Sequence, residues 1–251
     1  MLRRDELARW AGTFGVADEQ IRRDHLISHI LVALATLDGP GIVFYGGTAL
    51  ARTHLPVFRL SEDVDLLVDP RKDWAARVEE HMPRALRRHV GAVNWDPGPS
   101  GIPDRASARL VAGPVSVRVQ LVTLDPEQAR WPVERRRLDM RYADAPAMEM
   151  TVPTRSAFTA MKTLAWADRH APRDLADLAA LAELGAFDPA GAALVADLGG
   201  WLPIPAIFDH VPDATRSAWA VDLDHQMART PDPDTCLEKV RSGWAAVTRP
   251  A

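Results

Sequence analysis

Glycines 46 and 47 lie at a point in the sequence where a backbone loop could bind phosphate. They follow Ile42–Tyr45, an apolar run rich in strand-forming residues, and precede Thr48–Ala51, which favours a helix. Glycine lets the backbone approach a ligand closely, and a helix N-terminus presents unpaired N–H groups and the positive end of its dipole. The order of elements indicates a phosphate-binding loop, although a lone Gly-Gly pair is more often an ordinary turn.

An Asp-x-Asp pair, Asp63 and Asp65, follows at the start of a second predicted strand. Alternate side chains of a strand share a face, so both carboxylates project together while Val64 and Leu66 point into the core. Two such carboxylates suit Mg²⁺, which prefers oxygen ligands, and could bind two ions about 3.5–4 Å apart. A lone Asp-x-Asp is usually surface charge. Its combination with the glycines, in this order, is much more specific.

The composition is that of a folded, soluble chain. Of 251 residues, 47% are hydrophobic and 25% charged, which excludes a disordered, collagen-like or rod-shaped protein. The net charge of -4 argues against a globally basic surface for nucleic acid. Cys236 is the single cysteine, so neither an internal disulfide nor a zinc site built on several cysteines can form. The histidines His25, His29 and His54 show no partner spacing that argues strongly for a transition-metal site.

No signal-peptide core and no membrane-spanning apolar segment are apparent, so we expect a cytoplasmic protein without membrane contact. Periodicity predicts helices over most of residues 3–37, interrupted at Gly12 and Gly15, with Asp18 as the N-cap of the second. A helix over 72–88 should kink or split at Pro83. Further helices are expected at 154–168 and 173–184, strands at 42–45, 64–68, 90–95, 108–111, 115–124 and 147–152, and a loop at 96–105.

These motifs resemble the signature of the AbiEii/AbiGii toxin nucleotidyltransferase family, which includes the MenT toxins and belongs to the DNA polymerase β-like nucleotidyltransferase superfamily. The matching segments are Gly46–Leu50, Arg59–Leu66, a helical Lys162, and the Arg-Asp-x-x-Asp segment Arg173–Asp177. The resemblance covers about residues 20–185. It implies an α+β fold with a small mixed sheet flanked by helices. We expect a nucleotidyltransferase domain with N-terminal helices over residues 1–150 and a C-terminal helical domain over residues 151–251.

The resemblance also implies roles for individual residues. Asp63 and Asp65 would bind Mg²⁺, or Mn²⁺ in its place, and Asp174 and Asp177, singly or together, would complete the catalytic set with Lys162. The implied nucleotide-binding residues are Gly46, Gly47, Thr48, Arg59, Ser61 and Lys162. Simpler interpretations exist for two of these positions. Lys162 could be a surface lysine that lies along apolar neighbours, and Asp174 could be a first-turn acid that stabilises its helix dipole.

One position departs from the family pattern. Many members of the superfamily carry a third carboxylate on a later strand, where it acts as general base. Gln120 occupies the matching position of Val117–Leu121. Glutamine can orient a hydroxyl group, but it cannot take its proton or bind a metal as a carboxylate does. Either Asp174 or Asp177 supplies that role, or catalysis is weaker; Arg118 and Gln120 could instead face the nucleotide.

The function implied by the resemblance is that of a toxin in a toxin–antitoxin or phage-defence system. It would transfer nucleotides from a nucleoside triphosphate to RNA, most plausibly the tRNA 3′ end, and so block translation. A cognate antitoxin is the expected partner, and phosphate on Ser61 would place negative charge against the metal ligands. Two alternatives are a nucleotidyltransferase acting on a small molecule or protein, and a non-catalytic member of the fold.

Arginines that could track an RNA backbone, or simply form a solvated helix face, gather in two places. Trp131 and Tyr142 flank the second group and could stack on bases, although a packing role is the simpler interpretation. The two groups are Arg84, Arg87 and Arg88, and Arg135, Arg136, Arg137 and Arg141.

Overall fold

The computed structural model describes residues 2–37, 39–203 and 205–248 of the chain, which forms two compact units, Met1–Val152 and Pro153–Ala251. Unit 1 is built on a five-stranded sheet in the order β1-β2-β5-β4-β3. Neighbouring strands are antiparallel except β2 and β5, which are parallel. The strands are β1 (Ile42–Tyr45), β2 (Asp63–Val68), β3 (Val93–Trp95), β4 (Ser107–Ala112) and β5 (Val115–Thr123). The expected α+β class with a mixed sheet is confirmed.

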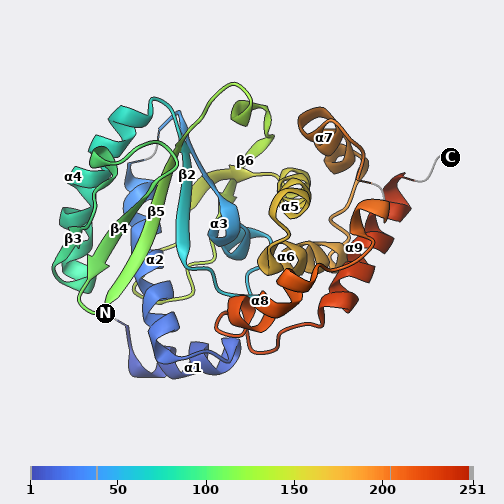
Figure 1. Cartoon of the computed structure of the whole chain (residues 1–251). Coiled ribbons are helices and arrows are strands. Elements are labelled where there is room, and N and C mark those ends of the chain that lie inside the picture. Colours follow the sequence, from blue (N-terminus) through green and yellow to red (C-terminus); the bar gives the residue numbers. More distant parts are fainter. Residues whose placement is uncertain (1, 38, 204, 249–251) are drawn as a thin grey trace. The chain divides into compact units, whose positions relative to one another are not determined.

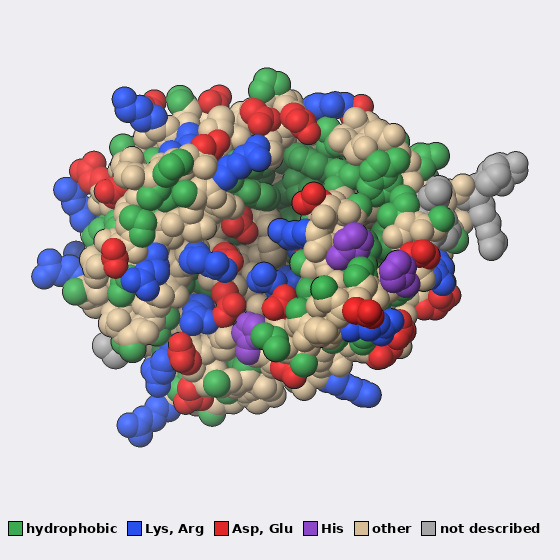
Figure 2. All heavy atoms as spheres, viewed as in Figure 1, with side chains coloured by type: hydrophobic (Ala, Val, Ile, Leu, Met, Phe, Trp, Pro, Cys, Tyr) green, Lys and Arg blue, Asp and Glu red, His purple; other side chains and the backbone are tan. Residues whose placement is uncertain are grey.

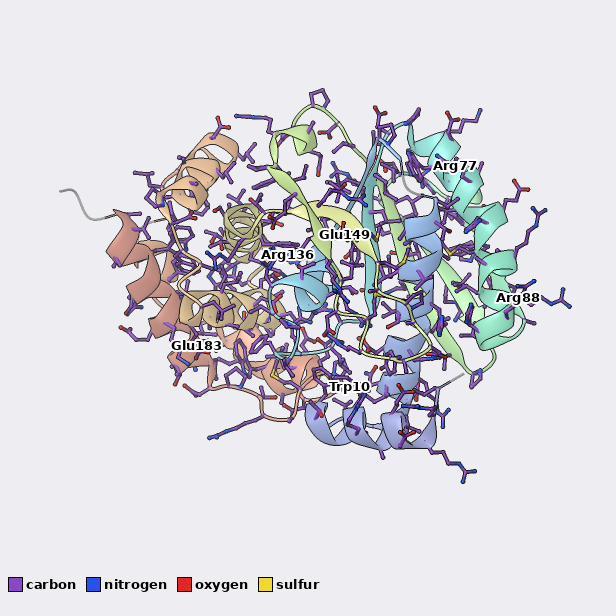
Figure 3. The ribbon with its side chains drawn as sticks, turned by 180° about the vertical axis from the view of Figure 1, so that it is seen from behind. Trp10, Arg77, Arg88, Arg136, Glu149 and Glu183 are labelled. Carbon is purple, nitrogen blue, oxygen red and sulfur yellow. The ribbon has the colours of Figure 1, made fainter. Side chains whose placement is uncertain are left out.

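Helices cover one face of this sheet. Figures 1 and 3 show α2 and α4 on the same side of the strands, and these two helices pack against each other. The helices of unit 1 are α1 (Arg4–Phe14), α2 (Asp18–Thr36), α3 (Gly46–Thr53) and α4 (Arg71–Val90).

The alternation of side chains along β5 follows from this one-sided cover. Val117, Val119 and Leu121 are buried, whereas Arg118 is exposed and Gln120 half-buried. The other face is polar at Arg118 and Gln120, whereas further along the strands Leu67 and Val122 form a small buried apolar cluster with Val43. In the space-filling view of Figure 2, acidic and basic side chains are interspersed over this part of unit 1.

Two expectations about the N-terminal helices are wrong. Gly12 does not interrupt α1, which continues to Phe14 and ends at Gly15, whose φ of 63° is left-handed. Asp18 is not an N-cap: it is the first residue of α2, and Ala17 stands at the cap without a side-chain hydrogen bond. Its carboxylate lies in the first turn, where it stabilises the helix dipole.

Pro83 does not split α4, which runs unbroken to Val90. Proline lacks the N–H that would bond to the carbonyl four residues earlier, here that of Glu79. Nε1 of Trp95 donates to this carbonyl at 3.1 Å, so the helix continues with its oxygen satisfied. The strand expected from Val90 consequently starts only at Val93, as β3.

A two-stranded sheet joins β6 (Val133–Arg137) to β7 (Glu149–Pro153). The sequence predicted β7 but not β6, whose residues Glu134–Arg137 are all charged. Three 3₁₀ turns complete the described elements: η1 (Pro99–Gly101), inside the expected loop, η2 (Gln128–Arg130) and η3 (Pro205–Phe208).

Unit 2 consists of helices around α6, which packs against α5, α8 and α9. Two of its helices have side-chain caps: Thr154 accepts from the N–H of Ala157 at α5, and Asp188 from that of Gly191 at α7. The helices are α5 (Arg155–Arg169), α6 (Pro172–Glu183), α7 (Pro189–Gly199), α8 (Asp213–Leu223) and α9 (Pro233–Thr248). Each helix in the described ranges of the chain is too short or too polar to cross a membrane.

Candidate functional site

The turn from β1 into α3 is built around two glycines. Gly46 has a φ of 78°, a conformation that favours glycine. The β1–β2 register pairs Tyr45 with Asp65, so the Asp65 side chain lies directly beside this turn. A Cβ atom at position 46 would overlap Oδ2 of Asp65. Only glycine therefore leaves room for the carboxylate at this point.

Gly47 has an equally specific neighbourhood. A Cβ atom there would lie 3.0 Å from Oγ of Ser61 and 3.2 Å from Nη2 of Arg59. Arg59 is buried, and its Nη1 donates to the carbonyl of Leu60 at 2.9 Å. A hydroxyl group and a guanidinium thus lie over the first turn of α3, where backbone N–H groups favour an anion. The structure brings together five predicted residues of unit 1: Gly46, Gly47, Arg59, Ser61 and Asp65.

Asp63 lies on the same face of β2 as Asp65, as the alternation predicted, with Val64 and Leu66 fully buried between and after them. The hydroxyl of Thr48 donates to the Asp63 backbone carbonyl. This predicted phosphate-loop residue therefore fixes α3 to β2, and its side chain is buried.

The Asp63 carboxylate is held by Arg118, a contact that the sequence did not indicate. Nε and Nη2 of Arg118 donate to its two oxygens at 2.8 and 2.7 Å. The parallel register pairs these two residues across β2 and β5. Hydrogen bonds and charge from Asp63 raise the pKa of Arg118. The Arg118 side chain is 58% exposed, so it can leave this position at small cost.

The two carboxylates fit a hard divalent cation by ligand type, since carboxylate oxygens are the donors Mg²⁺ prefers. A cation bound to Asp63 would compete with Arg118, which already donates one hydrogen bond to each carboxylate oxygen. A guanidinium released in this way would lie close to the phosphates of a nucleotide, for which its fork geometry is suited.

Gln120 stands opposite Asp65 in the register of β2 and β5. Its amide nitrogen donates to the backbone carbonyl of Arg105. The strand position at which the resemblance implies a third acid therefore holds a neutral side chain that donates to a neighbouring loop.

Unit 2 contains a buried ion cluster made by the remaining predicted residues. Nζ of Lys162 lies 2.8 Å from a carboxylate oxygen of Asp174 and 2.8 Å from one of Asp177. Arg169 also donates to both oxygens of Asp174, at 2.8 and 3.1 Å. Lys162 is buried, so it is not a surface lysine lying along apolar neighbours.

Asp174 does lie in the first turn of α6, but its side chain is fully buried within this cluster. Burial alone would raise the pKa of Asp174, yet Lys162 and Arg169 lower it to about 2. The carboxylate is therefore ionised at neutral pH. Arg169 was missed by sequence reasoning, although its place in the last turn of α5, five residues before Asp174, was visible.

The two arginine groups have different environments. Arg84, Arg87 and Arg88 are exposed on α4, and Figure 3 shows Arg88 extending outward. They form a solvated helix face on the helix-covered side of the sheet. Arg135 and Arg137 are exposed on β6, which is a strand and not a helix.

Arg141 and Tyr142 are unavailable to RNA because both are buried. Arg141 bonds to Asp24 at 2.9 Å and to the carbonyls of Ala51 and Pro56. The Tyr142 hydroxyl donates to Asp24 at 2.8 Å. Stacking of bases on Tyr142 is therefore excluded, and its packing role is confirmed.

A model of the nucleotidyl transferase AbiEii toxin family, of type IV toxin–antitoxin systems, matches residues 29–238. The chain belongs to this family. The AbiEii match spans both units, from α2 into α9, and includes every predicted site residue. Membership makes the chain a nucleotidyltransferase toxin, with a nucleoside triphosphate as substrate and an antitoxin as partner.

Solved structures with the same fold agree with this membership. MenT4, a nucleotidyltransferase toxin from Mycobacterium tuberculosis H37Rv, aligns with a TM-score of 0.69 at 19% identity, over 98% of this chain and 89% of that one. JHP933 from Helicobacter pylori aligns with a TM-score of 0.56 at 19% identity, over 92% of each chain. At these identities the likeness concerns the fold alone. No curated protein sequence matches the chain.

Proposed function

We propose that this AbiEii-family chain transfers nucleotides from a nucleoside triphosphate to the 3′ end of tRNA in the cytoplasm and thereby blocks translation. The observation that carries the proposal is the glycine turn at 46–47, enclosed by Ser61, Arg59 and Asp65. Such a turn at a helix N-terminus, beside two carboxylates on one strand face, is suited to a metal-bound triphosphate.

In the proposed reaction the terminal hydroxyl oxygen of the acceptor attacks the α-phosphorus. The bond from that phosphorus to the oxygen bridging to the β-phosphate breaks, and pyrophosphate leaves. Mg²⁺ held by Asp63 and Asp65 would offset the negative charge that develops on the phosphate oxygens. Gly46, Gly47 and Thr48 position the triphosphate, and Arg59 and Ser61 contact it over the first turn of α3.

Arg118 is assigned to the triphosphate as well. Its guanidinium pairs with Asp63 in the present structure, and its exposure allows it to move. Binding of the metal to Asp63 would free the guanidinium for the phosphates, so metal and nucleotide would bind together.

Lys162 is assigned to phosphate or to the leaving group. Asp174 and Asp177 hold its ammonium from two sides, and this supports a positioning role for both acids. A carboxyl group with a pKa near 2 is a poor proton acceptor at neutral pH, so Asp174 is not assigned as general base. Asp177, the other acid that contacts Lys162, remains the candidate for that step.

Exposed arginines and the toxin character of the family support the proposal of a tRNA acceptor. Arg135 and Arg137 on β6, and the exposed group on α4, can neutralise phosphates of a large acceptor. The α4 group lies on the opposite side of the sheet from Asp63 and Asp65. It is therefore assigned to distant parts of the RNA and not to the reacting end.

Ser61 offers a route for control by the antitoxin. Its hydroxyl lies over Gly47 beside Arg59. A phosphate group on Ser61 would carry about -1.5 to -2 charge and three acceptor oxygens into the space assigned to the substrate phosphates. It would exclude the nucleotide.

Incubation of the full chain with α-labelled nucleoside triphosphates, Mg²⁺ and total RNA tests the proposal. We expect label in the tRNA band, lost in Asp65→Asn and kept in Asp73→Asn, an exposed acid of α4. Oxidation of the tRNA 3′ end should prevent labelling. Label in a protein or small-molecule fraction, with none in RNA, would favour the alternative acceptors, and no label in any fraction would favour a non-catalytic member.

A further inference from the structure

A second group of potential metal ligands lies in unit 1 and shares no residue with the candidate active site. His25 and His29 are one turn apart on α2, and Asp144 follows in the segment between β6 and β7. One atom from each of these side chains lies within 4.8 Å of the other two. The positions 25 and 144 are 119 residues apart, so the fold alone brings them together.

The three ligand atoms form a nearly equilateral triangle. Nε2 of His25 lies 3.1 Å from both carboxylate oxygens of Asp144 and 3.2 Å from Nε2 of His29. Nε2 of His29 lies 3.4 Å from Oδ2 of Asp144. Ligands at about 2.0–2.1 Å from a tetrahedral ion are separated by about 3.3 Å, which matches these edges.

Hydrogen bonding alone does not account for the triangle. An ionised carboxylate only accepts, and each neutral imidazole carries at most one proton on Nε2. If both Nε2 atoms carry a proton, two N–H groups face each other across 3.2 Å; if only one does, two acceptors face each other along one edge. A cation at the centre would accept a lone pair from all three ligand atoms and remove the conflict between them.

Both imidazoles are buried beside the Asp144 carboxylate. His29 is almost fully buried, and its Nδ1 has no hydrogen-bond partner among the described residues. The polar chemistry of this ring is therefore directed through Nε2 to the cluster.

A pocket of about 270 Å³ lies against His25. Its lining includes His25 together with His89, Arg22 and Val115. Three protein ligands are one fewer than a closed structural zinc site uses. A water molecule or another small ligand in this pocket could supply the fourth.

We propose that His25, His29 and Asp144 form a binding site for a divalent transition-metal ion such as Zn²⁺, distinct from the Mg²⁺ site assigned to Asp63 and Asp65. Two imidazoles and one carboxylate form a donor set that suits zinc, cobalt and ferrous ions better than magnesium. The ion would fasten the segment between β6 and β7 to α2. His25 also contacts that segment through the ring of Tyr142, edge-on at 4.9 Å between centroids.

The test uses the full chain after chelator treatment and gel filtration, titrated with Zn²⁺ and with Co²⁺ as a spectroscopic probe. We expect one equivalent of Zn²⁺ to bind, visible absorption from coordinated Co²⁺, and a rise in the melting temperature. His29→Gln should weaken binding more than about 100-fold, because it removes a direct ligand. If His29→Gln does not fold, Asp144→Asn decides, since this side chain is partly exposed and keeps its size.

Two matched controls define the site. His210→Gln alters an exposed His–Asp pair with Asp209 at 2.7 Å and should bind metal like the unaltered chain. Asp63→Asn removes an assigned Mg²⁺ ligand and should also keep its Zn²⁺. Absence of stoichiometric Zn²⁺ in the unaltered chain, or equal affinity in the folded Asp144→Asn variant, overturns the proposal and leaves the triangle as a polar contact between helix and loop.

Discussion

At the residue scale, the site depends on Gly46, where even the single methyl group of an alanine side chain would not fit. Gly46 combines a left-handed φ with a carboxylate directly against its Cα, and neither feature tolerates a side chain. The sequence indicated a glycine turn here. The neighbour that requires it, Asp65, became evident only from the register of β1 and β2.

Gly46→Ala should reduce nucleotidyl transfer on the order of 100-fold or more, because it displaces Asp65 from its place beside the turn. Its control is Gly12→Ala, at an exposed position within α1 where a methyl group meets no atom within 4 Å. This control should leave activity unchanged and raise the free energy of unfolding by about 0.5–1 kcal/mol. Steady-state rates and urea denaturation check both variants, and equal activities would show that the Gly46 turn is not at the site.

Arg118 provides a second residue-scale test because it competes with a metal for Asp63. Arg118→Ala should lower the Mg²⁺ concentration needed for half-maximal activity and raise the KM for the nucleotide, since the guanidinium is assigned to the phosphates. Lysine cannot form the two parallel hydrogen bonds, so Arg118→Lys should give an intermediate result. Activity is measured as a function of Mg²⁺ concentration and then of nucleotide concentration. If neither the half-maximal Mg²⁺ concentration nor the KM changes, the assignment is refuted.

At the element scale, buried charge fixes how neighbouring segments are joined. Asp24 on α2 accepts from Arg52 of α3 at 2.8 Å, and from Arg141 and Tyr142 of the segment after β6. Arg141 and Tyr142 were predicted as candidate RNA contacts because arginines beside an aromatic residue can bind an RNA backbone and its bases. The same residue types also occur in buried networks. Only the fold distinguishes the two.

Asp24→Asn should lower the free energy of unfolding by about 3–5 kcal/mol, because it leaves buried guanidinium groups without their counter-charge. Asp18→Asn, in the exposed first turn of the same helix, should cost less than about 1 kcal/mol through the helix dipole. Chemical denaturation of the two variants measures the difference. Similar small losses for both would mean that the network adds no net stability.

The Lys162 cluster that joins α5 to α6 should make unit 2 sensitive to acid. The pKa of Asp174 falls from 3.8 to about 2 on folding, so its contribution is complete above pH 3.8 and is lost as the pH falls through 2. This shift corresponds to a free energy on the order of 2 kcal/mol. Lys162→Met should lose less stability between pH 5 and 2 than the unaltered chain. Lys239→Met, which breaks an exposed pair with Glu183, should follow the unaltered chain, and denaturation at several pH values compares them.

The sequence indicated most elements, and the exceptions have physical reasons. Alternating apolar residues identified β5, and the glycine and Asp-x-Asp motifs located β1, β2 and α3. Strand β6 was missed because four consecutive charged residues conceal any alternation. The continuity of α4 past Pro83 depends on Trp95, twelve residues further on, donating to a carbonyl that the helix cannot satisfy.

The sequence predicted which residues belong to the site, but it did not predict the contacts between them. Asp63, Asp65 and Lys162 could be chosen by type and spacing, but the contacts that Arg118 makes with Asp63 and Arg169 with Asp174 could not. The spacing of His25 and His29 was visible on one helix face, yet their third partner, Asp144, lies too far along the chain to be inferred. Non-local contacts of this kind are fixed only by strand register and helix packing.

At the scale of the whole molecule, the chain is slightly acidic, with both signs of charge interspersed on the face in Figure 2. Affinity for RNA must therefore come from local arginines. Expression should arrest growth, and the arrest should disappear in Asp65→Asn and in Lys162→Met while soluble protein is still made. If growth arrest persists in both variants, the toxicity does not depend on nucleotidyl transfer, which would contradict this prediction.

The fate of the phosphates tests the central claim most directly. The full chain is incubated with Mg²⁺, purified tRNA and a nucleoside triphosphate labelled at either the α- or the γ-phosphate. We predict that the α label enters tRNA, that the γ label leaves as pyrophosphate, and that the two amounts are equal. Asp65→Asn and Lys162→Met should lose both signals together. Entry of the γ label into the product, or release of pyrophosphate without labelled tRNA, would contradict nucleotidyl transfer to RNA.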